Sequence, residues 1–171
     1  MIEPPAIPPS QLRDFRQSSI PVTAIDIDIG ARTIMGEASG ETFFGKVAVG
    51  WSFRNRVVMD LWGDRKADWW GESIAAVCQK PWQYTCWHDH NAERIRKVTL
   101  DDATFQDCML AMLSVVKGSI PDPTYGATHY LNPTIVKTMP KWALGRSPIC
   151  AIGNHHFYAG VEPGDPKHTK V

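Results

Sequence analysis

Two carboxylates stand close together in the segment TIMGEASGE, residues 33–41, and a glycine precedes each of them. Glu37 and Glu41 would share one face of a continuing helix, but glycine is a poor residue for a helix interior. If a helix ends here, Glu37 lies in its last turn, where the negative end of the helix dipole raises the pKa of an acid, as burial also does. Such an acid stays protonated and can donate a proton in catalysis. The alternative is that both carboxylates lie in a surface loop.

A second group of polar and aromatic side chains lies in QYTCWHDH, residues 83–90. Amides, hydroxyls, aromatic rings and imidazoles together are typical of a groove for a sugar or a peptide. His88 and His90 have a spacing that can bind a metal on a strand, although exposed loop residues are the more common explanation. Several tryptophans with polar neighbours suit sugar rings, with partial burial as the alternative: Trp62, Trp69, Trp70, Trp82, Trp87 and Trp142.

Three histidines fall in the C-terminal third of the chain, at His129, His155 and His156. Strand alternation places His155 and His156 on opposite faces, so that only one of them can join His129. A zinc site of two histidines and Glu37 is conceivable. The chain has no H-E-x-x-H or similar local signature, so a metal site is the less favoured interpretation.

The elements that position these residues are expected to be mainly helical. Thr23 and Asp26 have the spacing of a capping box, and the helix that they begin is expected to end in the range 36–40, where glycine relieves the backbone. Further helices are expected at residues 45–58, 73–78 and 101–117.

The helix expected at residues 45–58 is apolar on most sides, which predicts a central position. Its polar residues are Arg54, Asn55 and Arg56, and we expect one or two of them to point toward a site. Residues 126–133 and 149–160 are expected to form two short, paired strands. The fold class is therefore α+β, mostly helical, with a small antiparallel sheet.

Composition narrows the class of protein. The chain has 171 residues, with 18 basic against 18 acidic residues, and this balance argues against a nucleic-acid partner. No segment has the roughly 20 apolar residues that cross a membrane, which argues against membrane insertion. Residues 1–20 are interpreted as a proline-rich arm without the features of a signal peptide, residues 21–160 as the domain, and residues 161–171 as a polar tail.

The four cysteines lack Cys-x-x-Cys spacing, so a zinc ribbon is not expected. Cys78 and Cys86 could bridge a short loop, and the sequence leaves this open. Cys108 falls on the apolar face of the helix expected at 101–117, whose core stripe is closed by Gly118, and is expected to be a buried thiol.

Four segments in order resemble the SleB/CwlJ-type cell-wall hydrolases, a family that includes spore cortex-lytic enzymes and related bacterial and phage proteins. The segments are ARTIMGEASGETFFGKVAVGWSFRNRV, QYTCW, DPTYGATHYLNP and IGNHHFY. The resemblance covers about residues 25–158 and implies a fold like that of lysozymes and lytic transglycosylases. Ser39 departs from the arginine that is frequent in the family.

The resemblance also implies the residues of the site. Glu37 matches the catalytic glutamate, and no metal or other cofactor is implied. The other matching positions are expected to bind substrate or shape the pocket: Glu41, Gln83, Tyr84, Thr85, Trp87, His129, Tyr130, Asn132 and His155. Glu41 is expected to be structural or to face the substrate.

The implied activity is cleavage of the bond between N-acetylmuramic acid and N-acetylglucosamine in peptidoglycan, by a lytic transglycosylase that needs a single carboxylate. A hydrolytic muramidase would need a second acid, for which Asp89, Glu41 and Asp122 are the candidates. A metal-dependent amidase or peptidase using His129 and His155 is a further alternative, and a wall-binding module without catalysis is the third.

The layout is similar to that of a phage or prophage endolysin. A single domain without a leader is expected to remain in the cytoplasm as a monomer until a holin opens the membrane. It would then act on the wall of the host in the periplasm.

Overall fold

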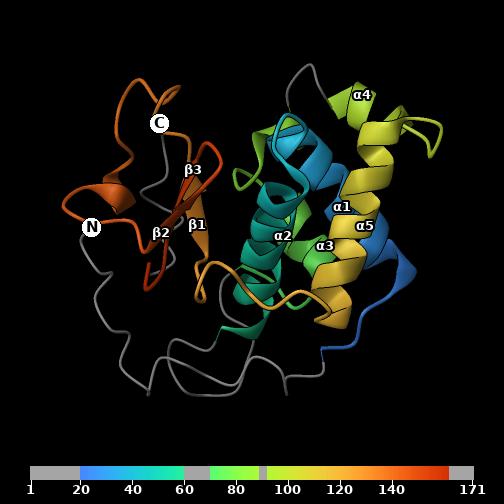
Figure 1. Ribbon diagram of the computed structural model, residues 1–171, viewed down its shortest axis with the longest axis horizontal. Coiled ribbons are helices and arrows are strands. Elements are labelled where there is room, and N and C mark those ends of the chain that lie inside the picture. Colours follow the sequence, from blue (N-terminus) through green and yellow to red (C-terminus); the bar gives the residue numbers. More distant parts are fainter. Residues whose placement is uncertain (1–19, 60–69, 89–91, 162–171) are drawn as a thin grey trace.

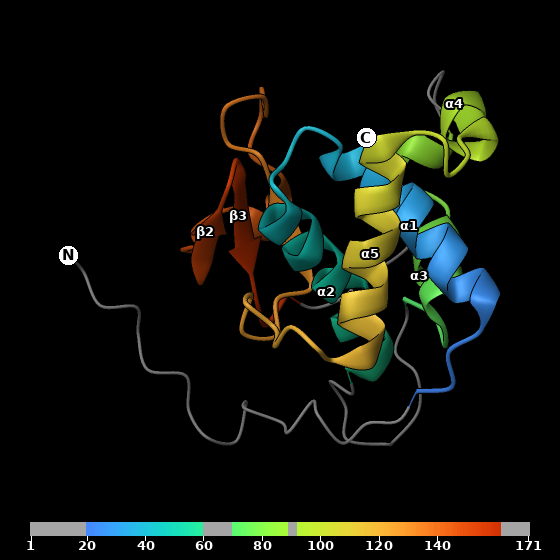
Figure 2. The same cartoon turned by 45° about the vertical axis from the view of Figure 1, so that its right-hand side comes forward.

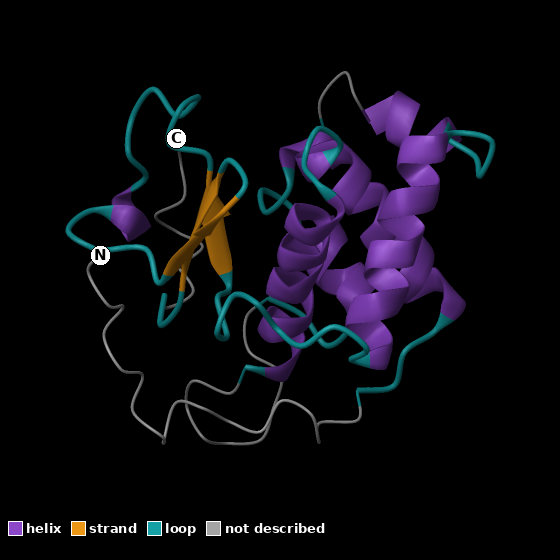
Figure 3. Ribbon diagram, in the orientation of Figure 1, coloured by secondary structure: helices purple, strands orange, loops and turns teal. Residues whose placement is uncertain are grey.

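The structure is a computed structural model, and it describes residues 20–59, 70–88 and 92–161. Its helices and strands are drawn in Figure 1 and are coloured by type in Figure 3. The helices are α1 (Ala24–Ala38), α2 (Phe43–Val58), α3 (Ile74–Gln79), α4 (Ala92–Lys97) and α5 (Ala103–Lys117), with short 3-10 helices η1 (Thr85–Trp87) and η2 (Lys141–Ala143). The strands are β1 (His129–Leu131), β2 (Cys150–Ile152) and β3 (His155–Tyr158).

The predicted capping box at the start of α1 is confirmed. The Thr23 hydroxyl accepts from the Asp26 amide at 3.2 Å, and the Asp26 carboxylate accepts from the Thr23 amide at 2.9 Å. The helix ends after Ala38, with Ser39 still in the right-handed conformation. The expectation that glycine relieves the backbone here is wrong, because Gly40 is not among the glycines with positive φ.

Helix α2 is the centre of the fold. Its N-cap is Thr42, and every residue from Gly45 to Val57 is buried. Helices α1 and α5 pack on it from one side and the sheet packs on it from the other, as both ribbon views show (Figure 1 and Figure 2). The predicted central position of this helix is confirmed.

Helix α5 has the predicted core stripe. Asp102 is its N-cap, and Gly118 ends it in the left-handed conformation with φ 63°. Its buried residues include Phe105, Met112 and Val115, which belong to the main core. Helix α4 and the two 3-10 helices were not expected from the sequence.

The sheet has three strands in the order β1-β3-β2, all antiparallel. The expectation of one strand at 149–160 is wrong, because a turn at Gly153 and Asn154 divides this segment into the hairpin β2–β3. Gly153 has φ 58°, which suits a tight hairpin turn. The predicted fold class, mostly helical with a small antiparallel sheet, is confirmed.

All four cysteines are free thiols, so Cys78 and Cys86 do not bridge, and Cys108 is buried as expected. Within the described ranges, none of the helices combines the length and the apolar character needed to cross a membrane. The expected arm at 1–20 and the expected tail at 161–171 lie almost wholly outside the described residues, as do Trp62, Trp69, Asp89 and His90.

Candidate functional site

Glu37 lies in the last turn of α1, as predicted, and its side chain is half-buried. Burial raises the pKa of this carboxyl above its ordinary value. Hydrogen bonds from Cys86 and Tyr130 and the positive charge of Arg56 oppose that rise only in part. The Tyr130 hydroxyl donates to Glu37 Oε2 at 3.2 Å. Burial therefore favours the protonated form of Glu37, and hydrogen-bond donors lie beside its carboxyl group.

Gly36 explains how η1 comes so close to Glu37. A Cβ at this position would lie 2.5 Å from Cys86 Cβ and 2.7 Å from Cys86 Sγ. The missing side chain thus admits Cys86 directly beside the carboxylate that follows in the sequence. The space at Gly36 is filled by the protein itself, so it does not serve as room for a substrate.

Arg56 is a buried cation at the centre of the site, and it connects several of the predicted residues. Its Nε donates to the Thr128 carbonyl at 2.7 Å, and its Nη1 donates to Gln83 Oε1 at 3.0 Å. Its guanidinium carbon lies 5.1 Å from the centroid of the Tyr84 ring. The expectation that a polar residue of α2 points toward a site is met by Arg56, whereas Arg54 packs on Trp51 and donates to the Val115 carbonyl.

Glu41 has a different environment from Glu37. Its Oε1 accepts from Asn154 Nδ2 at 2.9 Å, and its Oε2 accepts from the Asn154 amide at 3.3 Å. A Cβ on Gly153 would collide with Glu41 Oε2, so the glycine in this turn makes room for the carboxylate. Glu41 therefore joins the loop after α1 to the turn of the β2–β3 hairpin, and of its two expected roles the geometry favours the structural one.

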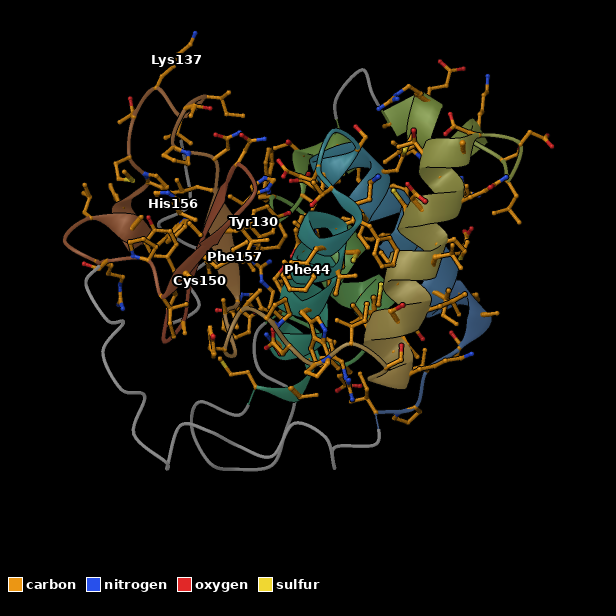
Figure 4. The ribbon with its side chains drawn as sticks, in the orientation of Figure 1. Phe44, Tyr130, Lys137, Cys150, His156 and Phe157 are labelled. Atoms are coloured by element: carbon orange, nitrogen blue, oxygen red, sulfur yellow. The ribbon has the colours of Figure 1, made fainter. Side chains whose placement is uncertain are left out.

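The alternation predicted for His155 and His156 is confirmed, and it decides which histidine is near the site. Tyr130 pairs with Phe157, and Ile152 pairs with His155, so these side chains share one face of the sheet. Figure 4 shows Tyr130 and Phe157 on the side that faces α2, and His156 on the other side. The Tyr130 and His155 ring centroids are 5.0 Å apart.

His129 lies on the face opposite His155, because it pairs with Tyr158. Its ring contacts Trp70 and Trp142, and burial lowers its pKa to about 2. Because His129 and His155 lie on opposite faces of the sheet, the hypothetical zinc site of these two histidines and Glu37 is not formed. No group of three potential metal-binding side chains occurs anywhere in the part of the chain that the structure describes.

His155 is buried, and its Nδ1 has no hydrogen-bond partner. This nitrogen lies 3.6 Å from Glu41 Oε1. Burial lowers the pKa of His155, and the Glu41 charge opposes this only in part. We therefore interpret the approach as a contact of a neutral imidazole, and not as an ion pair, at neutral pH.

Two residues predicted to bind substrate, Tyr84 and Trp87, are deeply buried. Tyr84 is only 3% exposed and stacks edge-on against Phe53, and burial raises its pKa well above the ordinary value. Trp87 is 4% exposed and donates to the Thr33 hydroxyl at 3.0 Å. Of the two expected roles, their burial disfavours direct glycan contact and favours shaping the pocket, because each side chain completes the core beneath the site.

The remaining predicted residues lie at the surface or in turns. Thr85 is exposed at the start of η1, next to Cys86. Asn132 Oδ1 accepts from the Thr134 amide at 3.0 Å and the Thr134 hydroxyl at 2.6 Å, so this side chain stabilises the turn after β1. Of the tryptophans expected to meet sugars, Trp70 is in the core, Trp142 is half-buried and Trp82 is exposed.

Comparison with known proteins identifies the family of this chain. The family model described as Cell Wall Hydrolase matches residues 40–158. The chain belongs to the cell wall hydrolase family. The matched region begins at residue 40, so it does not include Glu37. The resemblance to SleB/CwlJ-type proteins seen in the sequence motifs is thereby confirmed at the level of the family.

Two spore cortex-lytic enzymes are similar to this family member. Those of Halalkalibacterium halodurans and Bacillus subtilis are each 30% identical over 132 residues, which is 77% of this chain. The chain spans about a third of their length, 34% and 37% respectively.

Two solved structures have the same fold. The catalytic domain of the Bacillus cereus SleB protein has a TM-score of 0.63 and 27% identity, covering 82% of this chain and 96% of that one. The catalytic domain of the germination-specific lytic transglycosylase SleB from Bacillus anthracis has a TM-score of 0.61 and 28% identity, covering 80% and 95%.

Proposed function

We propose that this chain degrades peptidoglycan by cleaving the glycosidic bond between N-acetylmuramic acid and N-acetylglucosamine, as a lytic transglycosylase with Glu37 as its acid. The observation that carries the proposal is the half-buried Glu37, whose pKa is raised by burial and whose Oε2 accepts from Tyr130. The similar Bacillus anthracis domain, described as a lytic transglycosylase, supports the same chemistry.

The proposed reaction uses one carboxyl group twice. Protonated Glu37 gives its proton to the glycosidic oxygen while the bond from that oxygen to C1 of muramic acid breaks. Positive charge develops at C1, and the 6-hydroxyl oxygen of the same muramic acid forms a bond to it. The hydroxyl proton passes to the Glu37 carboxylate, which restores the acid and leaves a 1,6-anhydro sugar without consuming water.

The surroundings of the other candidate acids favour a single-carboxylate reaction. Glu41 has both oxygens engaged by Asn154. Asp122 accepts from Asn55 at 2.9 Å and from the Thr124 and Gly126 amides at 2.7 and 2.8 Å, so its carboxylate holds the loop between α5 and β1. Both carboxylates are engaged in holding loops, which disfavours their use in positioning the water molecule that an inverting muramidase requires. The third candidate, Asp89, lies outside the described residues.

A metal-dependent amidase or peptidase is a weaker candidate, because His129 and His155 are on opposite faces of the sheet. A wall-binding module without catalysis would not need a half-buried acid with a raised pKa beside a hydroxyl donor. Both alternatives predict distinct outcomes in the experiment that follows: released stem peptides in the first case and no released fragments in the second.

The test compares the products and rates of two matched variants on purified peptidoglycan. Glu37→Gln is expected to keep the fold and to lose about 100- to 10,000-fold in rate, which is the usual contribution of a general acid. Glu93→Gln, which changes an exposed glutamate of α4, is expected to keep its rate. Mass spectrometry of the wild-type products should find anhydromuramic ends. Reducing muramic ends would instead indicate hydrolysis, and a Gln variant with near wild-type rate would remove Glu37 from the mechanism.

We further propose that the chain acts on the bacterial wall as a monomer, with host lysis by a phage or prophage as its setting. The same chemistry would also serve phage entry or wall remodelling. A holin gene beside the coding sequence would favour host lysis, and tail genes would favour entry.

A further inference from the structure

Trp82 has a backbone conformation that is unusual for its side chain. Its φ is 68°, and it is one of two non-glycine residues with positive φ in the described ranges. The Gln83 amide donates to the Lys80 carbonyl at 3.2 Å, which closes a four-residue turn with Pro81 and Trp82 at its centre. Proline followed by a residue of positive φ is the pattern of a type II turn, in which the second position normally holds glycine or asparagine. A tryptophan there is disfavoured by its bulk.

Burial does not compensate for this conformation. Trp82 is 83% exposed, the highest value among the large hydrophobic residues that the structure describes as exposed. Its ring therefore gains little from the core, although a tryptophan has the largest apolar surface of any side chain. Strained backbone positions cluster at active sites and ligand clamps, so an exposed ring on such a backbone is a candidate for binding.

Gln83, the last residue of this turn, connects the turn to the candidate site. Gln83 accepts the hydrogen bond from Arg56, whose charge acts on Glu37. Farther along the same segment, Cys86 forms hydrogen bonds to Glu37. The backbone of Trp82 is thus connected to the proposed acid through Gln83 with Arg56, and through Cys86 farther along the segment.

We propose that Trp82 forms a subsite of the glycan strand, in which its indole stacks on the apolar face of a sugar ring. This inference rests on the proposed function and names a contact for its substrate. A flat aromatic surface matches the C–H face of a β-linked N-acetyl sugar, and its rigid turn holds the ring in place before the strand arrives.

Tyr125 supplies a matched control, because it is the other non-glycine residue with positive φ, 53°, and it is 56% exposed. Its turn is held by the Asp122 carboxylate, which accepts from the Gly126 amide, and not by a group that contacts Glu37. If both aromatic residues are only exposed turn residues, substitutions at the two positions should have the same effect on glycan affinity.

The experiment measures binding of peptide-free glycan strands by calorimetry in the Glu37→Gln background, where the strands stay intact. Trp82→Gly is expected to weaken binding roughly tenfold while Tm stays the same or rises, because glycine suits a left-handed position. Trp82→Phe keeps a ring and is expected to retain most of the affinity. Tyr125→Gly is expected to leave affinity unchanged.

Three results would overturn the subsite: unchanged affinity in Trp82→Gly, an equal loss in Tyr125→Gly, or a dependence on Trp82 for isolated stem peptides and not for glycan strands. A fall of Tm in Trp82→Gly would overturn it too, since that would indicate a structural role. The binding assay needs no catalysis. If products show that no glycosidic bond is cleaved but Trp82 still governs glycan binding, the proposed function fails while the subsite stands.

Discussion

Glu37 and Glu41 are four residues apart in the sequence, and the structure gives them opposite surroundings. Glu37 is half-buried beside Cys86 and Tyr130, and its pKa is raised. Glu41 accepts two hydrogen bonds from Asn154 and holds a hairpin turn in place. The two carboxylates therefore differ because distant segments supply different donors, and not because of their local sequence. One environment suits proton transfer and the other suits cross-linking of two loops.

The largest effect is expected where a side chain is added beside Glu41. Gly153→Ala places a Cβ against Glu41 Oε2 at a residue with φ 58°. Left-handed strain and overpacking together should lower the free energy of unfolding by about 3 kcal/mol. Urea denaturation measures this change.

Gly40→Ala is the matched control for Gly153→Ala, since a Cβ at Gly40 meets nothing within 4 Å. Its free energy of unfolding should stay within about 0.5 kcal/mol of the wild type. Equal stability of the two variants would show that Glu41 does not occupy the space beside Gly153.

A smaller loss is expected beside Glu37. In Gly36→Ala the new Cβ lies 2.5 Å from Cys86 Cβ, which should destabilise the fold by about 1–3 kcal/mol and move Cys86 away from Glu37. The rate of peptidoglycan cleavage should therefore fall even under conditions in which the variant is fully folded. Combined with Cys86→Gly, the stability loss should be less than additive in a double-mutant cycle, and strict additivity would contradict the contact.

The features predicted correctly from the sequence are those with local causes. The capping box of Thr23 and Asp26, the apolar α2 and the glycine that ends α5 each depend on neighbouring residues. The last-turn position of Glu37 was also predicted correctly, although the glycine on which that prediction depended does not adopt the expected conformation. Local patterns fix where an element begins and which face it buries.

The missed features depend on contacts between distant segments. Nothing near Gly36 indicates that it must admit Cys86, and nothing near Gly153 indicates that it clears Glu41. The burial of Tyr84 and Trp87 follows from contacts with distant helices, since Tyr84 packs on Phe53 of α2 and Trp87 donates to Thr33 of α1. Their residue types suggested a sugar contact, which this burial disfavours. Only the hairpin turn had a local signal, since a Gly-Asn pair between two short apolar runs is typical of such a turn.

A third and smaller effect distinguishes the two glutamates by how the free energy of unfolding changes with pH when each is replaced by glutamine. The folded state raises the pKa of Glu37, so wild-type stability is full at low pH and falls as pH rises through that raised value. Glu37→Gln lacks this loss, and its stability relative to wild type should increase from acid to alkaline pH. Glu41→Gln should instead lose about 1 kcal/mol at neutral pH, because an amide is a poorer acceptor for Asn154 than a carboxylate. Thermal unfolding across a pH series measures both, and parallel curves for the two variants would contradict the contrast.

The smallest effect is expected from removing the Tyr130 hydroxyl, which donates to Glu37. Tyr130→Phe keeps the ring against His155 and Phe157 but removes the hydrogen bond to Glu37 Oε2. That bond lowers the pKa of Glu37, so its loss should raise the pKa further and move the alkaline limb of the pH–rate profile to higher pH, with a few-fold fall in rate at the optimum. Tyr158→Phe removes a hydroxyl from the opposite face of the sheet and should leave the limb unchanged. A shift toward lower pH in Tyr130→Phe would mean that Tyr130 stabilises the protonated acid, and the hydrogen bond would then have to run from Glu37 to the tyrosine oxygen.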